Sequence, residues 1–386
     1  MPKGRFFLGT MAAAAAGLLA ACRVAEVRLL VLLPLSGPQA AYGRSLLDGA
    51  RLGEEAVNAA GGVRGRKLVL AVEDSGGEGS RAVQVLKGWA STAGCRLVVG
   101  GATSEEALAL APEAERLGLL LLSPSASSPL LSDRFPHFFR TWPSDAVEAG
   151  AAAEFLTYSL HATEVLVVTE PGPYGEGLAE AFRKAFCDGL RRVETLAAGG
   201  GRGPDEPLPP GPQALFLAGK PETLLPYLER ARSRGDDRAA VAASAFSRAG
   251  LNGGTAVSCE GLCVVAPAAP ETPRWPEATA FEDAFVQRLG HRPDRYARSA
   301  YDAVRVAAAV AGAGKTADEL RQALLSLKKF SGASGPIAFG PGGDLSRPAE
   351  VLVCRGGSLV PLREVSAEVL PGLQERVARR RLGGKR

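Results

Sequence analysis

Short apolar runs alternate with helical patterns along the chain, and this alternation constrains the fold more than any other feature. The runs are rich in Val and Leu, as buried parallel strands are. The first series predicts strands at 27–33, 67–73, 96–100 and 119–122, with helices at 43–60, 81–93 and 105–117. Strands that alternate with helices form a parallel sheet covered on both faces. The sequence therefore predicts an α/β fold.

The pattern then restarts, which indicates a second lobe. The second series predicts helices at 146–161, 177–187 and 222–234, with strands at 164–169, 213–217 and 239–243. A chain of 386 residues with 46% hydrophobic residues is long enough to bury two cores. Connections are expected at 138–143, at the Pro-rich stretch 266–277 and at 332–336. We expect two doubly wound parallel-sheet lobes.

Charge and motif content exclude several classes of function. Lys and Arg number 45 and Asp and Glu 41, a net charge of +4 that does not indicate a nucleic-acid partner. The chain has three His, and its Cys spacings match no zinc pattern, so we expect no metal and no cofactor. Residues 312–316 resemble the end of a phosphate loop, but Ala309 stands where the first Gly is required. With no Gly-x-Ser-x-Gly motif either, the sequence predicts no enzyme.

The amino terminus has the pattern of an export signal. Lys3 and Arg5 precede an uncharged apolar stretch of about 15 residues, shorter than a membrane span. Residues 19–22 then resemble the bacterial lipobox, whose Cys is acylated. We expect residues 1–21 to be a lipoprotein signal peptide and the chain to be anchored to a membrane through lipidated Cys22. A plain signal peptide with a chance Cys, or a cytosolic chain with an apolar start, remains the alternative.

Seven short segments, spread over nearly the whole chain, together resemble the leucine/isoleucine/valine-binding protein family. They are residues 34–37 with 41–43, 57–67, 73–74, 123–129, 139–140 with 144–145, 174–177, and 301–303 followed by 335–339 and 343–344. Members are extracytoplasmic binding components of amino-acid ABC importers, with the type I periplasmic binding protein fold. The resemblance implies two lobes joined by a three-crossover hinge, with the ligand in the cleft. It places residues 27–140 plus 272–333 in lobe one, and residues 141–271 plus 334–386 in lobe two.

Candidate ligand-binding residues follow strands of the predicted sheets. Thr103 and Glu106 have the spacing of a capping box, so the helix that begins here offers free N–H groups and a positive dipole end. The resemblance implies that Ser104 donates its hydroxyl to a ligand carboxylate there. It further implies that the stretch Ser125, Ala126 and Ser127 contacts the ligand ammonium and carboxylate, and that Tyr42 and Tyr174 border the ligand. A helix cap without a ligand and an ordinary Ser/Pro turn are the alternatives.

The sequence departs from the family pattern in the second lobe. Amino-acid binders supply an acidic side chain after a late strand, but residues 243–248, which include Phe246 and Arg248, contain no acid. Residues 218–220 end in Lys220 and lack a tyrosine that some relatives have. Burying an ammonium without a counter-charge is costly, which counts against an ordinary zwitterionic amino acid. Lys220 and Arg248 either meet a second anionic group or are solvated loop charges.

The resemblance implies a monomeric solute-binding component of an ABC importer. It would lie in the cell envelope or periplasm and bind a small carboxylate, a branched-chain amino acid or a related compound, by hinge closure. Its partner would be a membrane permease. The alternative is a ligand-sensing or cell-wall-regulatory lipoprotein of the same fold.

Overall fold

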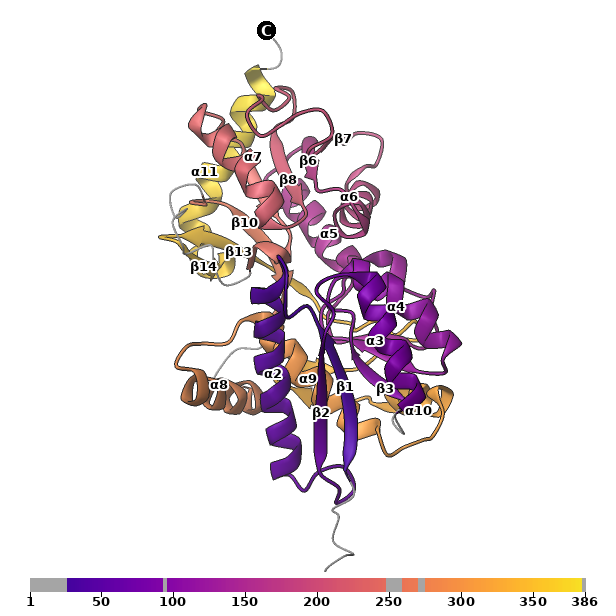
Figure 1. The fold of residues 1–386 in the computed structure, drawn as a ribbon. Helices are drawn as coiled ribbons and strands as arrows, with labels where there is room; N and C mark the ends of the chain where they lie inside the picture. The colour runs from indigo at the N-terminus through magenta and orange to yellow at the C-terminus, as the bar shows by residue number, and fades with distance from the viewer. Residues whose placement is uncertain (1–25, 93–95, 248–258, 270–274, 384–386) are drawn as a thin grey trace, which may run out of the picture.

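The protein has two α/β lobes, one above the other in Figure 1. The structure, a computed structural model, describes residues 26–92, 96–247, 259–269 and 275–383. Within these residues no helix is both long and apolar enough to span a bilayer. The predicted α/β fold with parallel-sheet lobes is confirmed.

The first lobe contains a sheet of five parallel strands in the order β2-β1-β3-β4-β5. Its strands are β1 (Val27–Leu33), β2 (Leu68–Asp74), β3 (Leu97–Gly100), β4 (Leu120–Ser123) and β5 (Phe138–Arg140). Its helices are α2 (Ala40–Ala59), α3 (Gly79–Thr92), α4 (Ser104–Arg116), α8 (Pro276–Leu289), α9 (Arg295–Val310) and α10 (Ala317–Ser326), with the short 3-10 turn Pro129–Leu131. A small hairpin, β11 (Phe330–Gly332) and β12 (Gly335–Ile337), completes this lobe.

The second lobe contains a seven-stranded sheet in the order β14-β13-β10-β9-β8-β6-β7. Its strands are β6 (Glu164–Thr169), β7 (Arg192–Ala197), β8 (Ala214–Ala218), β9 (Ala239–Ala242), β10 (Cys263–Pro267), β13 (Ala349–Arg355) and β14 (Ser358–Pro361). Its helices are α5 (Asp145–Glu154), continued by the π-helical turn Phe155–Ser159, then α6 (Pro173–Phe186), α7 (Pro221–Ser233) and α11 (Leu362–Gly383), with a 3-10 turn at Ser244–Ser247. Strands β13 and β14 run antiparallel to their neighbours, a feature that the sequence patterns did not predict.

Each sheet is buried on both faces, which explains the nearly unbroken apolar runs. In β1, Leu29 and Val31 pack into a core shared with α2 and α9, while Leu30 and Leu32 pack into a core shared with α3 and α4. Successive side chains of a strand point to opposite faces, so a strand covered on both sides must be apolar throughout. The second sheet has two such cores as well.

One predicted connection, at residues 332–336, is wrong. These residues form the turn and edges of the β11–β12 hairpin, with Gly335 at a φ of 110°. Beyond the hairpin, Ile337, Phe339 and Leu345 belong to a first-lobe core. The chain therefore passes to the second lobe between Leu345 and Ala349, and not at residue 334.

Close packing of α2 on α9 generates a test of this fold. A Cβ placed on Gly49 would lie 1.9 Å from the backbone oxygen of Ala297, whereas one placed on Gly150 of α5 would have no atom within 4 Å. We expect Gly49→Ala to lower the free energy of unfolding by about 1–3 kcal/mol through overpacking. The control Gly150→Ala should raise it by about 0.5–1 kcal/mol, as alanine does in a helix interior. Urea denaturation measures both, and equal effects of the two substitutions would contradict the packing described here.

Candidate functional site

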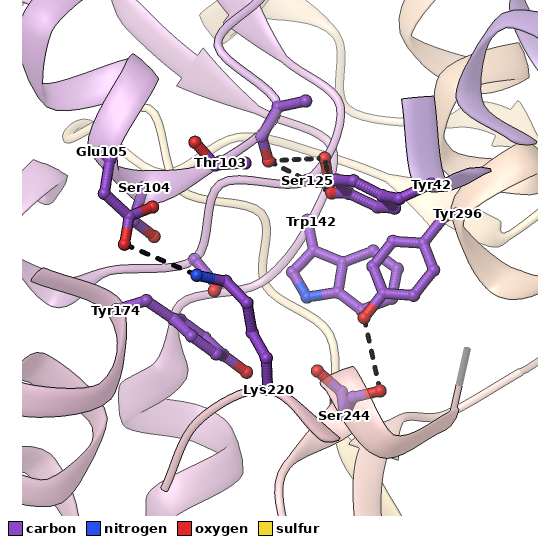
Figure 2. A pocket seen from close by; sticks show the side chains of 12 residues that line it. Tyr42, Thr103, Ser104, Glu105, Ser125, Trp142, Tyr174, Lys220, Ser244 and Tyr296 are labelled. Carbon is purple, nitrogen blue, oxygen red and sulfur yellow. Dashed lines mark hydrogen bonds and ion pairs between the residues drawn. The ribbon is translucent and has the colours of Figure 1, made fainter. Parts of the chain in front are cut away.

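A small cavity lies between the two lobes, at the carboxyl ends of strands from both sheets. The first lobe contributes most of its lining and the second lobe closes it, as Figure 2 shows. The lining residues are Tyr42, Ala102, Thr103, Ser104, Glu105, Ser125, Ser127, Trp142, Tyr174, Lys220, Ser244 and Tyr296. The cavity has a volume of about 20 Å³, which is room for one or two waters. The two lobes therefore lie close together around the site.

Helix α4 begins at the cavity wall. The predicted capping box is confirmed, because Thr103 Oγ1 accepts a hydrogen bond from Glu106 N at 3.2 Å and Thr103 N donates to Glu106 Oε2 at 3.1 Å. This cap orients the first turn so that its free N–H groups and positive dipole end face the cavity side. Ser104, the first residue of the helix, is buried and lines the cavity. An anion placed here would be stabilised.

The loop after β4 carries the predicted serines to the same place. Ser125 Oγ donates to Ala102 O at 2.9 Å, and the Tyr42 hydroxyl lies 2.5 Å from Ser125 Oγ. Ser128 N donates to Ser104 Oγ at 3.2 Å, so this loop is tied to the start of α4. The hydroxyls therefore stand at neighbouring strand ends, as expected for ligand sites in open α/β sheets.

A fully buried arginine holds this loop from behind. Arg140, at the end of β5, donates through Nη1 to Ala126 O at 3.3 Å and to Ser128 O at 3.0 Å. Its Nη2 lies 2.7 Å from both Ser132 Oγ and Asp344 Oδ1. Burial lowers the pKa of Arg140, while Asp344 raises it. Ala126 does not line the cavity, since its carbonyl is directed to Arg140 and its N–H donates to Ser123 Oγ at 2.9 Å. The sequence expectation that Ala126 contacts a ligand is therefore not supported by its position.

Three aromatic rings form one wall of the cavity. Trp142 stacks on Tyr296 with ring centroids 4.5 Å apart, and Tyr42 meets the edge of Tyr296 at 5.1 Å. The Tyr296 hydroxyl donates to Ser244 O of the second lobe at 3.3 Å. Sequence reasoning missed Trp142 and Tyr296, which approach the site from the first interlobe connection and from α9. Their rarity, three Trp and six Tyr in the chain, was the only signal available.

An ion pair occupies the second-lobe side of the cavity. Lys220 Nζ lies 2.7 Å from Glu170 Oε1 and 3.8 Å from Glu105 Oε1 of the first lobe (Figure 2 draws the latter contact). The Lys220 backbone N–H also donates to Glu170 Oε2 at 2.6 Å. Nζ lies 6.0 Å from the ring centre of Tyr174. The Lys220 side chain is only 18% exposed, so it is not a solvated loop charge.

Two further acids are buried beneath the cavity. Glu148 of α5 accepts a hydrogen bond from Ser244 N at 3.0 Å, and burial raises its pKa to about 7. Burial and the neighbouring Glu148 raise the pKa of Asp145 well above its usual value, although Ser127 and Arg140 oppose the shift. Residues 243–248, where the family pattern places an acid, contain none. The second-lobe acids near the cavity are instead Asp145 and Glu148 on α5, and Glu170 directly after β6. A search for polar residues at the end of every predicted strand would have found Glu170.

Besides Ala126, the predicted residue Phe246 does not line the cavity. Phe246 has no exposed surface and packs in a core of the second sheet with residues such as Leu217 and Leu224. The turn Ser244–Ser247 directs its ring into the lobe, so Phe246 is a core residue and the prediction is wrong. Arg248 and Cys22 lie outside the described residues. In that described part, no cluster of three or more His, Cys, Asp or Glu side chains is suited to hold a metal.

Comparisons with known proteins agree with this architecture. Residues 26–197 and 207–358 match the periplasmic binding protein family. Leu/Ile/Val-binding protein homolog 3 of Brucella melitensis is 33% identical over 183 residues, 47% of this chain and 50% of that protein, so the match spans half of that relative. Leu/Ile/Val-binding protein BraC3 of Rhizobium johnstonii is 28% identical over 341 residues, 83% of this chain and 89% of that one.

A solved structure extends the comparison of folds. It is the branched-chain amino acid transporter substrate binding protein LivJ from Streptococcus pneumoniae, in complex with isoleucine. The two structures superpose with a TM-score of 0.75 at 24% identity, over 87% of this chain and 98% of LivJ. The family resemblance inferred from the sequence segments is thus confirmed.

The buried Glu148 generates a prediction of pH-dependent stability. Its pKa is 4.5 when unperturbed and about 7 in the folded protein. Between these values the unfolded chain releases the proton that the folded chain keeps, so stability falls as pH rises through this window and then levels off. We expect Glu148→Gln, which can still accept from Ser244 N, to be more stable than the parent at pH 8 by about 3 kcal/mol, and about equal at pH 4.5.

Urea denaturation across this pH range tests the prediction. Glu154→Gln, an exposed position on the same helix, is the matched control and should follow the parent curve. A Glu148→Gln protein that retains the parent's loss of stability between pH 4.5 and 7 would show that this carboxyl is not the group responsible.

Proposed function

This chain belongs to the periplasmic binding protein family, and we propose that it is the solute-binding component of an ABC importer. Members of the family bind solutes outside the cytoplasm and are not enzymes. The relative BraC3 and the structural neighbour LivJ are named for binding branched-chain amino acids or their transport. We accordingly assign this protein an extracytoplasmic location and a membrane permease as its partner. Cys22, if acylated after removal of residues 1–21, would anchor it to a membrane.

The start of α4 carries the proposal that the ligand has a carboxylate. Ser104 and Ser127 line the cavity beside the capped first turn of this helix. Free N–H groups, two hydroxyls and the helix dipole together suit a carboxylate, whether of a branched-chain amino acid or of a related acid. Tyr42 and Ser125 support this wall, and Tyr174 covers it from the second lobe.

Hinge closure is the mechanism that best fits the size of the cavity. Ligand pockets usually have volumes of about 300–1,000 Å³, far more than the 20 Å³ present between the lobes. A ligand must therefore enter while the lobes are further apart. Rotation about the interlobe connections would then close Tyr174 and Lys220 over it, and the closed form would dock on the permease.

A set of four matched compounds tests the carboxylate site. Leucine and isocaproate carry a carboxylate on the same carbon skeleton, whereas leucinamide and isocaproamide carry an amide in its place. We expect at least one of the two acids to bind about tenfold or more tightly than its own amide, because only the acid gains charge-assisted hydrogen bonds at α4. Phenylalanine, hydrocinnamate and their amides repeat the comparison with a larger side chain. Calorimetry with the full-length protein in detergent measures the affinities.

Removal of the hydroxyl groups of Ser104 and Ser127 tests whether the ligand binds at this site. The double variant Ser104→Ala/Ser127→Ala should weaken binding of the preferred acid by about 100-fold or more, since each hydroxyl bonds a charged group. Ser91→Ala, on the exposed face of α3, should leave binding unchanged. Unchanged affinity in the double variant would contradict the assigned site, and equal binding of acids and amides, or none, would contradict the proposed function.

A further inference from the structure

We infer that the ligand of this site is a carboxylate that carries no ammonium group, because the protein's own ammonium, Lys220 Nζ, already occupies the acidic side of the cavity. This inference rests on the proposed function and narrows its ligand class. A branched-chain amino acid, the ligand suggested by the names of the relatives, is thereby disfavoured.

Glu170 holds Lys220 through both its backbone and its side chain. Its backbone N–H donates to one oxygen of Glu170 at 2.6 Å, and its Nζ contacts the other at 2.7 Å. The Glu170 side chain is 5% exposed and the Lys220 side chain 18% exposed. Glu170 follows β6 and Lys220 follows β8, adjacent strands whose register places their ends side by side. The ion pair is therefore held by the ends of two paired strands of the second lobe, and not by a loose loop.

The remaining acids near the cavity leave little charge for a ligand ammonium. Among the described lining residues the one acid is Glu105, and its carboxylate already lies 3.8 Å from Nζ. Its side chain is 35% exposed, so water screens its charge. Burial raises the pKa of both Asp145 and Glu148, because the charged form of a carboxyl is disfavoured away from water. The serine hydroxyls and the α4 terminus on the opposite side favour an anion.

A zwitterion would therefore meet a like charge when the lobes close. Its ammonium either lies within a few ångströms of Nζ or displaces Lys220 from Glu170. The second event separates a largely buried ion pair, and leaving one partner of such a pair uncompensated is strongly unfavourable. A carboxylate without an ammonium meets neither obstacle, and Lys220 adds a favourable charge to its binding site.

The same two sets of compounds and the same detergent-purified protein test the inference. Isocaproate should bind about tenfold or more tightly than leucine, and hydrocinnamate more tightly than phenylalanine, because each pair differs in the ammonium alone. Acids that bind more tightly when they carry the ammonium would overturn the inference while leaving the carboxylate site of the proposed function intact. Failure of every acid to bind better than its amide would remove both.

Substitution of Lys220 tests whether this residue causes the preference. Lys220→Met keeps most of the unbranched side chain, removes its charge and leaves Glu170 unpaired. The ratio of leucine to isocaproate affinity should therefore rise about tenfold or more. The control Lys184→Met, whose parent side chain on α6 is 72% exposed, should keep the parent ratio. An unchanged ratio in a folded Lys220→Met protein would overturn the inference.

A second variant covers the case in which the unpaired Glu170 prevents folding. Lys220→Met/Glu170→Gln removes both charges of the ion pair and leaves this part of the second lobe neutral. We expect the preference for isocaproate over leucine to shrink about tenfold in this protein, because the repelling charge is gone. A double variant that discriminates as strongly as the parent would show that the preference does not come from Lys220.

Discussion

The candidate site depends on the buried guanidinium of Arg140. This group has no exposed surface, and it satisfies backbone carbonyls of the loop after β4 together with Ser132 and Asp344. A buried cation is tolerated only when its donors are paired, so the loop is held in one shape by the need to satisfy it. The same loop then presents Ser125 and Ser127 beside the start of α4. Arg140 therefore fixes the position of these hydroxyl groups at this edge of the first sheet.

Charge distinguishes the two sides of the cavity. The first lobe presents a helix amino terminus and hydroxyl groups, which suit an anion. The second lobe presents Lys220, already paired with Glu170 at the end of β6. Burial raises the pKa values of Glu148 and Asp145, which lie below the cavity. The relatives named for branched-chain amino acids share the fold with this chain, while its cavity carries an internal ammonium.

Local sequence patterns predicted the parts of the site that follow strands of the first sheet. Ser104, Ser125 and Ser127 were predicted from the family resemblance, which agrees with their positions after predicted strands. Patterns could not reveal contacts that form only when the lobes meet, such as Tyr296 with Ser244, or which acid pairs with Lys220. Phe246 was misplaced because a single aromatic residue after a strand fits a core and a cleft equally well. Gly and Pro residues suit a hairpin as well as an interlobe connection, so the sequence does not distinguish the two at β11 and β12.

A crystal structure of the protein with isocaproate would show both the position of the carboxylate and the state of the ion pair. We expect the carboxylate at the first turn of α4, within hydrogen-bond distance of Ser104 and Ser127, with Lys220 still paired to Glu170. Isocaproate in the larger hollow of about 440 Å³ lined by Arg44, His291 and Arg292 would contradict it. So would a carboxylate at the start of α4 with Lys220 swung away from Glu170, because the internal ion pair would then not define the ligand.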